Sequence, residues 1–215
     1  MLRRTSLVLA LVILTSGCQT LYNATLEKVF GMEKRQIFKK SVEDVNAEQK
    51  KAQESFKDSI TKLKELYNFK GGQLEAVYNK LKSSYENSQA QANKVHERIQ
   101  NMDGVAKSMF SEWDKEIRTY SNQTFAENSR RQLNDTKTRY SQLIKSVRES
   151  ESSMQPVLKQ LSDHVLYLKH NLNASSIGTL KGESASIQTE IESLIKRMNG
   201  SIQEADAFIQ TLLNE

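Results

Sequence analysis

The sequence predicts an all-α fold, an elongated antiparallel four-helix bundle or coiled coil. Only one proline and eight glycines occur in 215 residues, so residues that interrupt helices are sparse. From residue 38 onwards, apolar side chains recur every three or four positions, as on a helix face that packs against other helices. Turn-forming stretches divide this pattern into four segments of about 40 to 48 residues. Equal lengths joined by short turns let neighbouring helices run antiparallel along their whole extent.

The first segment predicts a helix over about 24–69, followed by a turn. Lys70, Gly71 and Gly72 end the periodic run, and a glycine pair at this place is typical of a helix C-cap and a tight turn. The residues expected to face the core of the bundle share the 3–4 spacing and are Phe38, Val42, Val45, Gln49, Ala52, Phe56, Ile60, Leu63 and Tyr67.

The second segment predicts a helix over about 73–120. Gly104 lies inside it and costs about 1 kcal/mol relative to alanine. Because the apolar spacing continues through Gly104 without a shift, we expect one continuous helix with a weak point. Its inward positions are Leu74, Tyr78, Leu81, Tyr85, Ser88, Ala92, Val95, Ile99, Met102, Ala106, Met109, Trp113, Ile117 and Tyr120.

The third segment predicts a helix over about 129–170, after a turn at 121–128. Two stretches, 124–127 and 129–132, fit a capping box at its start. Pro156 lacks a backbone donor and predicts a kink near residues 152–156, with a true break as the alternative. The inward positions are Leu133, Thr136, Tyr140, Leu143, Val147, Ser150, Met154, Val157, Leu161, His164 and Leu168.

The fourth segment predicts a helix over about 175–213, after a turn rich in capping residues at 169–175. Its inward positions are Ile177, Leu180, Ser184, Ile187, Ile191, Leu194, Met198, Ile202, Ala205, Ile209 and Leu212. Four such helices favour a single bundle domain over 24–215. A flatter array of helical hairpins that dimerises is the alternative.

An export signal precedes the bundle. Arg3 and Arg4 are followed by an apolar run over 7–14 and then by Gly17 and Cys18, an arrangement that looks like a bacterial lipoprotein signal. It predicts cleavage after residue 17, diacylglycerol on the Cys18 sulfur and a linker over 18–23. The apolar run is too short for a membrane span, which needs about 20 residues. An ordinary secretory signal or an uncleaved helix is the alternative.

The cysteine count, the net charge and the residue after Cys18 limit the compartments and the partners that we expect. Cys18 is the only cysteine, so no disulfide forms within the chain. Removal of residues 1–17 takes away Arg3 and Arg4 and leaves 29 basic and 26 acidic side chains, a net charge of +3. This balance does not point to nucleic acid. Gln19 follows Cys18, at the position where an aspartate would signal that a lipoprotein stays in the inner membrane. We therefore expect the protein at the periplasmic face of the outer membrane, or else in the periplasm.

Motifs for catalysis, metal binding or nucleotide binding do not emerge from the sequence. The residues three positions before the histidines are Asn93, Leu161 and Tyr167, so the Glu-x-x-His motif of di-iron bundles is missing. The sequence likewise has no phosphate-binding loop. We therefore expect no catalytic residue, no metal and no cofactor. His164 is predicted to be a hydrogen-bonded core residue.

Four polar residues interrupt the apolar seam: Gln49, Ser88, Ser150 and Ser184. Such residues lower stability but can fix helix register. The alternatives are a polar channel inside the bundle or a face for a partner chain.

Several stretches resemble the family catalogued as domain of unknown function 2959, and together they extend from about residue 22 to the end of the chain. They are residues 33–35, 71–75, 110–113, 154–157, 165–174 and 205–209. The resemblance implies a helical coiled-coil protein that often carries a lipoprotein signal, and it implies no activity or catalytic residue.

The sequence favours a non-enzymatic, lipid-anchored envelope protein that acts as a scaffold, spacer or interaction partner. The alternative is a helical bundle that binds a lipid or another amphiphile, and an enzyme is a third reading. We expect contacts with the membrane through Cys18 and with an unknown envelope protein or a second copy. The turn at Lys169, His170, Asn171 and Asn173 is a candidate docking site, with a capped helix–helix turn as the alternative.

Overall fold

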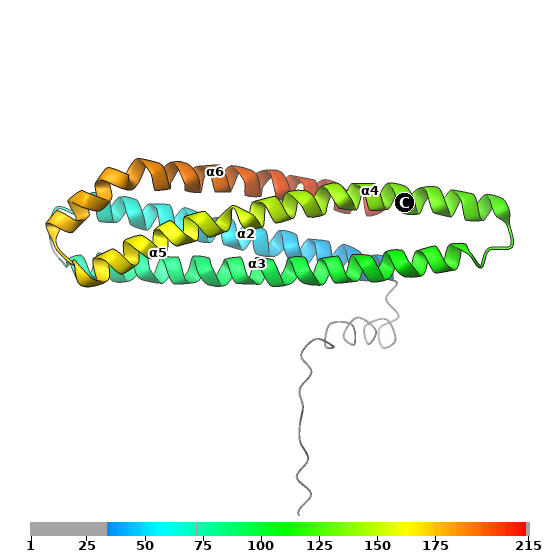
Figure 1. Cartoon of the computed structure of the whole chain (residues 1–215), viewed down its shortest axis with the longest axis horizontal. Helices are drawn as coiled ribbons and strands as arrows, with labels where there is room; N and C mark the ends of the chain where they lie inside the picture. Colours follow the sequence, from blue (N-terminus) through cyan, green and yellow to red (C-terminus); the bar gives the residue numbers. More distant parts are fainter. Residues whose placement is uncertain (1–33, 72, 214–215) are drawn as a thin grey trace, which may run out of the picture.

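In the part of the chain that the structure describes, five α-helices form four antiparallel rods (Figure 1). The computed structural model describes residues 34–71 and 73–213, and no strand occurs among them. The helices are α2 (Lys34–Tyr67), α3 (Leu74–Ile117), α4 (Gln123–Ser152), α5 (Met154–His170) and α6 (Ala174–Leu213). α4 and α5 follow each other along the third rod, so the five helices make four rods. The predicted all-α bundle is confirmed.

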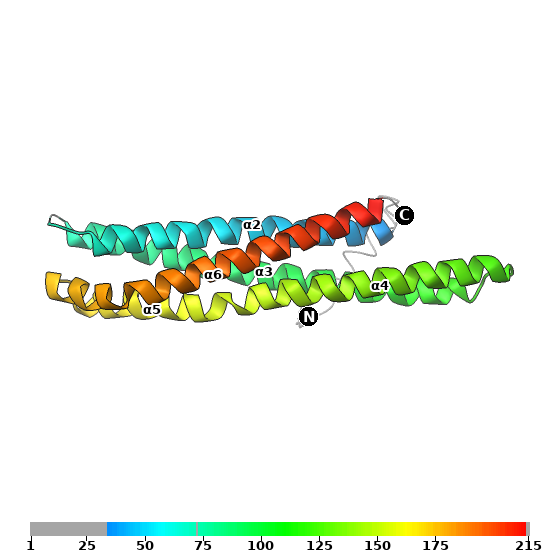
Figure 2. The same ribbon diagram turned by 90° about the horizontal axis from the view of Figure 1, so that it is seen from above.

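The rods form a closed ring in which sequence neighbours are also neighbours in space. α2 packs on α3 and α6, and the α4–α5 rod packs on the same two helices from the other side. Figure 2 shows the rods lying side by side along the long axis. With 44 residues, α3 is about 65 Å long.

The two ends of the bundle differ. We call the end with the α3–α4 turn the hairpin end. The closed end carries the turn at Gly71 and the α5–α6 turn. At the hairpin end, α3 and α4 extend past the first described residues of α2 and the last of α6 (Figures 1 and 2).

The core runs along the whole bundle and follows the predicted apolar positions. Phe38 and Phe56 in α2, Ile99 in α3 and Ile191 in α6 are fully buried. At the hairpin end, the Phe38 ring meets Phe110, Tyr140 and Phe208 edge-on, with centroid separations of 5.5–5.8 Å. One layer of aromatic rings therefore joins α2, α3, α4 and α6.

The tight turn predicted at the glycines and the continuous second helix are confirmed, whereas α2 ends at Tyr67, four residues before Gly71, so Gly71 is not its C-cap. Gly71 has φ +135°, a conformation that L side chains rarely adopt, and it forms the turn between α2 and α3. Gly104 lies within an uninterrupted α3.

The start of the third rod differs from the prediction. α4 begins at Gln123 rather than near 129, and neither predicted capping box forms its N-terminus. Asn122 is the cap instead, because its side-chain oxygen accepts hydrogen bonds from the amides of Thr124 (2.9 Å) and Phe125 (3.3 Å). Ser129 lies about two turns further on, where its hydroxyl accepts a hydrogen bond from the Trp113 indole at 2.8 Å.

The third rod is interrupted near Pro156 at a single residue, Ser153. Pro156 cannot donate a hydrogen bond to the carbonyl of Ser152. The amide and hydroxyl of Ser153 both donate to the Glu149 carbonyl, at 3.2 and 2.7 Å, and this closes the end of α4. α5 then starts at Met154 and continues along the same rod (Figure 2).

Tyr120 was predicted to lie in the core, but α3 ends at Ile117, and Tyr120 in the following turn is 49% exposed.

The predictions for the start of the chain lie outside the described residues. They are the signal peptide over 1–17, Cys18, the linker over 18–23 and the helix start at 24. Among the described helices, none combines the length and the apolar character that a bilayer span requires.

Candidate functional site

The predicted docking turn lies at the closed end, between α5 and α6. Lys169 and His170 are the last two residues of α5, and Asn171 and Asn173 belong to the turn. All four residues are exposed. The structure therefore brings together the four residues that the sequence singled out.

Two of these four residues cap helices. The Asn171 side chain donates to the Tyr167 carbonyl at 3.0 Å and so closes α5. The Asn173 side-chain oxygen accepts from the amide and the hydroxyl of Ser176, at 3.0 and 3.1 Å, and so opens α6. No such role is found for Lys169 and His170, whose side chains extend from the last turn of α5.

Large apolar side chains are exposed around the same turn. Leu166 is 58% exposed, and Tyr167 and Leu172 are each 38% exposed. The periodic pattern missed them, because it marks the residues that face inwards. Apolar groups beside a lysine and a histidine form a surface suited to another protein, where aromatic and aliphatic side chains provide most of the contact area.

Beneath this turn, the closed end buries two titratable side chains. Tyr67 of α2 and His164 of α5 meet edge-on with ring centroids 6.4 Å apart. His164 Nδ1 donates to the Gln160 carbonyl at 2.9 Å, which confirms the predicted core histidine. Burial lowers the pKa of His164, although the Gln160 hydrogen bond and the charges of Glu183 and Asp163 oppose this shift. Burial also raises the pKa of Tyr67.

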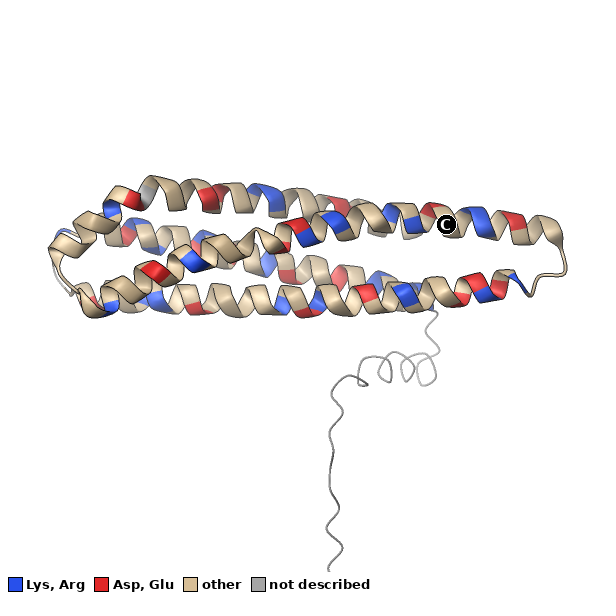
Figure 3. Cartoon of the chain, viewed as in Figure 1, with Lys and Arg blue, Asp and Glu red and all other residues tan. Residues whose placement is uncertain are grey.

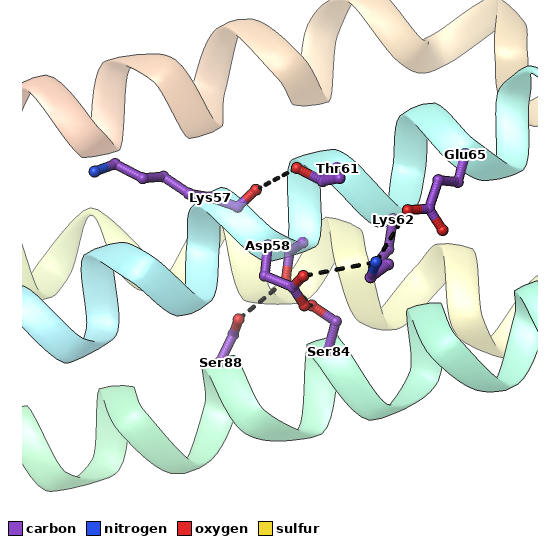
Figure 4. Close-up of polar contacts among 8 residues, drawn as sticks. Lys57, Asp58, Thr61, Lys62, Glu65, Ser84 and Ser88 are labelled. Atoms are coloured by element: carbon purple, nitrogen blue, oxygen red, sulfur yellow. Dashed lines mark hydrogen bonds and ion pairs between the residues drawn. The ribbon is translucent and has the colours of Figure 1, made fainter.

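A chain of hydroxyl groups joins α2 to α3 between the aromatic layer and the closed end (Figure 4). Ser84 donates to the Asp58 carboxylate at 2.7 Å, so its single proton is used. Ser59 must then donate to Ser84 (2.9 Å), Ser88 to Ser59 (3.0 Å) and Ser55 to Ser88 (2.8 Å). Each of these protons points towards the carboxylate, and Ser84, Ser59 and Ser88 each donate once and accept at least once.

Polar pairs also join α2 to α6. Gln49 and Ser201 exchange two hydrogen bonds, of 3.0 and 3.1 Å, and both residues are fully buried. Gln53 donates to Asn199 at 2.7 Å. For Gln49 and Ser88, the structure thus agrees with the register-fixing alternative. The side chain of Ser184 is outside the described part.

Asp103 of α3 is the centre of a charged cluster that lies where α3 meets α4. Its carboxylate accepts from Lys107 (2.8 Å), Arg148 (2.9 Å) and Tyr140 Oη (3.1 Å). Burial favours the neutral acid, but hydrogen bonds from Lys107 and Tyr140 and the charges of Lys107 and Arg148 outweigh it and lower the pKa of Asp103. This cluster links α3 to α4.

The other described side chains that could serve in catalysis or metal binding lie apart from one another. His96 forms an exposed pair with Glu151 at 2.5 Å. Within residues 34–71 and 73–213, no three His, Cys, Asp or Glu side chains gather closely enough to hold a metal ion. Figure 3 shows that charges of both signs alternate along every helix.

Open grooves lie on the surface between the described helices. One, of about 480 Å³, runs between α4 and α6, with Leu143 and Phe208 along it and Arg139, Lys145, Glu149 and Glu204 around it. A second surrounds the Ser153 interruption, and a third lies beside Trp113 at the hairpin end. The predicted binding of an amphiphile calls for a space between the helices, whereas Ala92 and Ala106 are packed within the core.

Comparison with known proteins gives one match. The model of the family described as "Protein of unknown function (DUF2959)" matches residues 22–212. No curated protein and no solved structure matches the chain.

Proposed function

The chain belongs to the DUF2959 family, and from its structure we propose that it is a non-enzymatic, lipid-anchored spacer in the bacterial envelope. In this proposal, the Cys18 lipid holds one end at the periplasmic face of the outer membrane. The α5–α6 turn at the closed end then presents a docking surface to a second envelope protein.

The observation that carries the proposal is the continuous core. Fully buried side chains occur from Phe38 at the hairpin end to Leu63 and Leu168 at the closed end. Because each rod contacts two others along its length, the bundle is a stiff body about 65 Å long. A stiff rod held at one end keeps its other end at a fixed distance from the anchor.

The direction of α2 supports the choice of the closed end. Lys34, the first described residue, lies at the hairpin end, since it forms an ion pair with Glu112 near the end of α3. The chain between Cys18 and Lys34 therefore joins the bundle at that end. A lipid on Cys18 would leave the α5–α6 turn farthest from the membrane when the rod stands upright.

Photo-crosslinking in cells tests the docking surface. A photoreactive amino acid replaces Leu166 or Tyr167 in the full chain, and the matched control replaces Lys145, an exposed residue in the middle of the rod. We expect both closed-end positions to capture one envelope protein that the control position does not capture. Equal labelling at all three positions would contradict the proposal, and capture of a second copy would replace it with self-association.

The capping roles make a more selective mutation possible. Replacement of Lys169 and His170 by alanine keeps both asparagine caps, so we expect loss of the crosslinked partner with unchanged thermal unfolding. Replacement of Asn171 and Asn173 instead removes two caps and lowers stability. If only the asparagine variant loses the partner, the turn has a structural role and the docking surface lies elsewhere.

A further inference from the structure

We propose that the tip of the α3–α4 hairpin, residues 118–131, is a second membrane contact, which rests on the headgroups of the bilayer that holds Cys18. The inference depends on the proposed lipid attachment of Cys18. The proposed contact adds a lipid-binding surface on the folded domain, and it fixes the orientation of the bundle relative to the membrane.

The turn itself and the start of α4 lie beyond the place where α2 enters the bundle, whereas Ser129, near the end of the tip, bonds to Trp113 and lies level with the start of α2. Lys34 pairs with Glu112, and the Arg35 guanidinium lies 5.4 Å from the centre of the Trp113 ring. α3 continues for five residues after Glu112, to Ile117, which adds about 8 Å before the turn begins. The α3–α4 turn is therefore the outermost described part of the hairpin end (Figures 1 and 2).

The chain between Cys18 and Lys34 is long enough to let the tip reach the bilayer. Fifteen residues, 19–33, separate the two positions. Fully extended, they span about 50 Å. This reach is several times the distance by which the tip extends past Lys34, so the lipid and the tip can meet one surface.

The side chains of the tip suit a lipid headgroup region. Phe125 is 60% exposed, the largest fraction among the exposed large apolar side chains of the described residues, and Tyr120 is 49% exposed. Aromatic side chains are favoured at the boundary between headgroups and acyl chains, where the ring leaves water.

The charge of the tip points to the same partner. Residues 118–131 contain three arginines, Arg118, Arg130 and Arg131, and one acidic residue, Glu127. Arg118 is paired with Asp114 of α3 at 2.5 Å, so Arg130 and Arg131 are the two cations that would meet the headgroups. Cations close to an anionic bilayer are attracted to its surface. A net positive turn with two exposed aromatic rings therefore has the composition of a membrane-surface contact.

The closed end has exposed apolar side chains too, but it cannot share this contact in an upright rod. Leu166 and Leu172 lie at the opposite end of helices about 65 Å long. The closed end thus provides a control from the same molecule.

Fluorescence quenching in membranes tests the proposal. Trp113 is the only tryptophan, so Trp113→Phe gives a background without indole emission. Phe125→Trp places one indole at the tip, and Leu166→Trp places one at the closed end. Each full, acylated protein is incorporated into vesicles of phosphatidylethanolamine and phosphatidylglycerol, with and without brominated acyl chains.

We expect the indole at position 125 to shift to shorter wavelength and to lose intensity with brominated lipid, while the indole at position 166 does neither. If both proteins float with the vesicles and neither is quenched, the tip contact is wrong and the lipid anchor stands. If neither protein floats, the anchor itself fails. Protection of position 125 from acrylamide without quenching by brominated lipid would show that a second copy covers the tip, which overturns the proposal.

Charge reversal separates the two parts of the contact. Arg130→Glu with Arg131→Glu, in the Phe125→Trp and Trp113→Phe background, should reduce the quenching at position 125 in anionic vesicles. The matched control, Arg197→Glu, reverses one exposed charge on α6 and should leave the quenching unchanged. Equal quenching in both variants would contradict an electrostatic contribution from the tip.

Discussion

The hairpin end and the closed end of the bundle differ in how their helices are supported. At the closed end, all four rods finish together, and the last turns bury Leu63, Leu168, Tyr67 and His164. At the hairpin end, α3 and α4 extend beyond the described parts of their neighbours, and Ala126 is the one buried residue of the tip. The comparison suggests that the core keeps the rod stiff up to the aromatic layer around Phe38, and that the tip beyond it is a surface for contact.

The largest expected effect is on the aromatic layer below the tip. Phe38→Ala removes a fully buried ring that contacts three other rings, so we expect a loss of about 3–5 kcal/mol in the free energy of unfolding. Phe125→Ala, at the tip of the same end, should change it by less than about 0.5 kcal/mol. Urea unfolding followed by circular dichroism measures both, and equal losses would show that the tip belongs to the core.

The hydroxyl chain between α2 and α3 lies between the aromatic layer and the closed end, and its disruption should show a smaller effect. Ser59→Ala removes a buried hydroxyl that receives one proton and donates another, so Ser88 loses its acceptor and Ser84 loses a donor. We expect a loss of about 1–3 kcal/mol. The control Thr61→Ala removes an exposed hydroxyl of the same helix, and a similar loss there would mean that the hydroxyl chain contributes nothing beyond helix propensity.

Each end has one asparagine that caps the start of a helix, which allows a matched pair of variants. Asn173→Ala at the closed end and Asn122→Ala at the hairpin end each remove a cap worth about 1 kcal/mol. Hydrogen exchange should show the Asn122→Ala effect confined to the first turns of α4, because few buried contacts couple the tip to the core. Faster exchange along the whole of α4 would contradict that separation.

The smallest effect depends on pH and belongs to the closed end. The pKa of His164 is lower in the folded protein than its ordinary value of 6.5, so the unfolded chain binds the proton more readily. Stability is therefore complete above about pH 6.5 and decreases as the pH falls from there towards the lower pKa of the folded state. His164→Leu should flatten this dependence in thermal unfolding between about pH 7 and about pH 5. An unchanged slope would assign the dependence to other groups.

The sequence was sufficient to predict most of the core but few of the contacts between helices. Spacing alone placed Phe56, Ile99 and Leu161 in the core, because an apolar stripe fixes the face that a helix buries. It could not pair Ser59 with Ser84 and Ser88, since the register between two helices depends on packing along their whole length. It also missed Phe208, which is buried beside the predicted Ala205 and Ile209.

The turns were predicted less well than the helices. Tyr120 continues the apolar spacing of α3 but lies beyond the end of the helix, where no second layer covers it. At the docking turn, composition indicated Asn171 and Asn173, which prove to be caps. The exposed Leu166 and Leu172 give no periodic signal. The apolar periodicity predicts the buried face of a helix, so it gives no information about a surface formed by outward-facing residues.

The central claim is that the rod stands on the bilayer with its hairpin end down. Neutron reflectometry of the full acylated protein on a supported bilayer measures the thickness of the protein layer directly. An upright rod predicts a layer of about 65 Å next to the headgroups, set by the length of α3. A layer of about 25 Å, the width of two packed helices, would show that the bundle lies flat and would contradict the account.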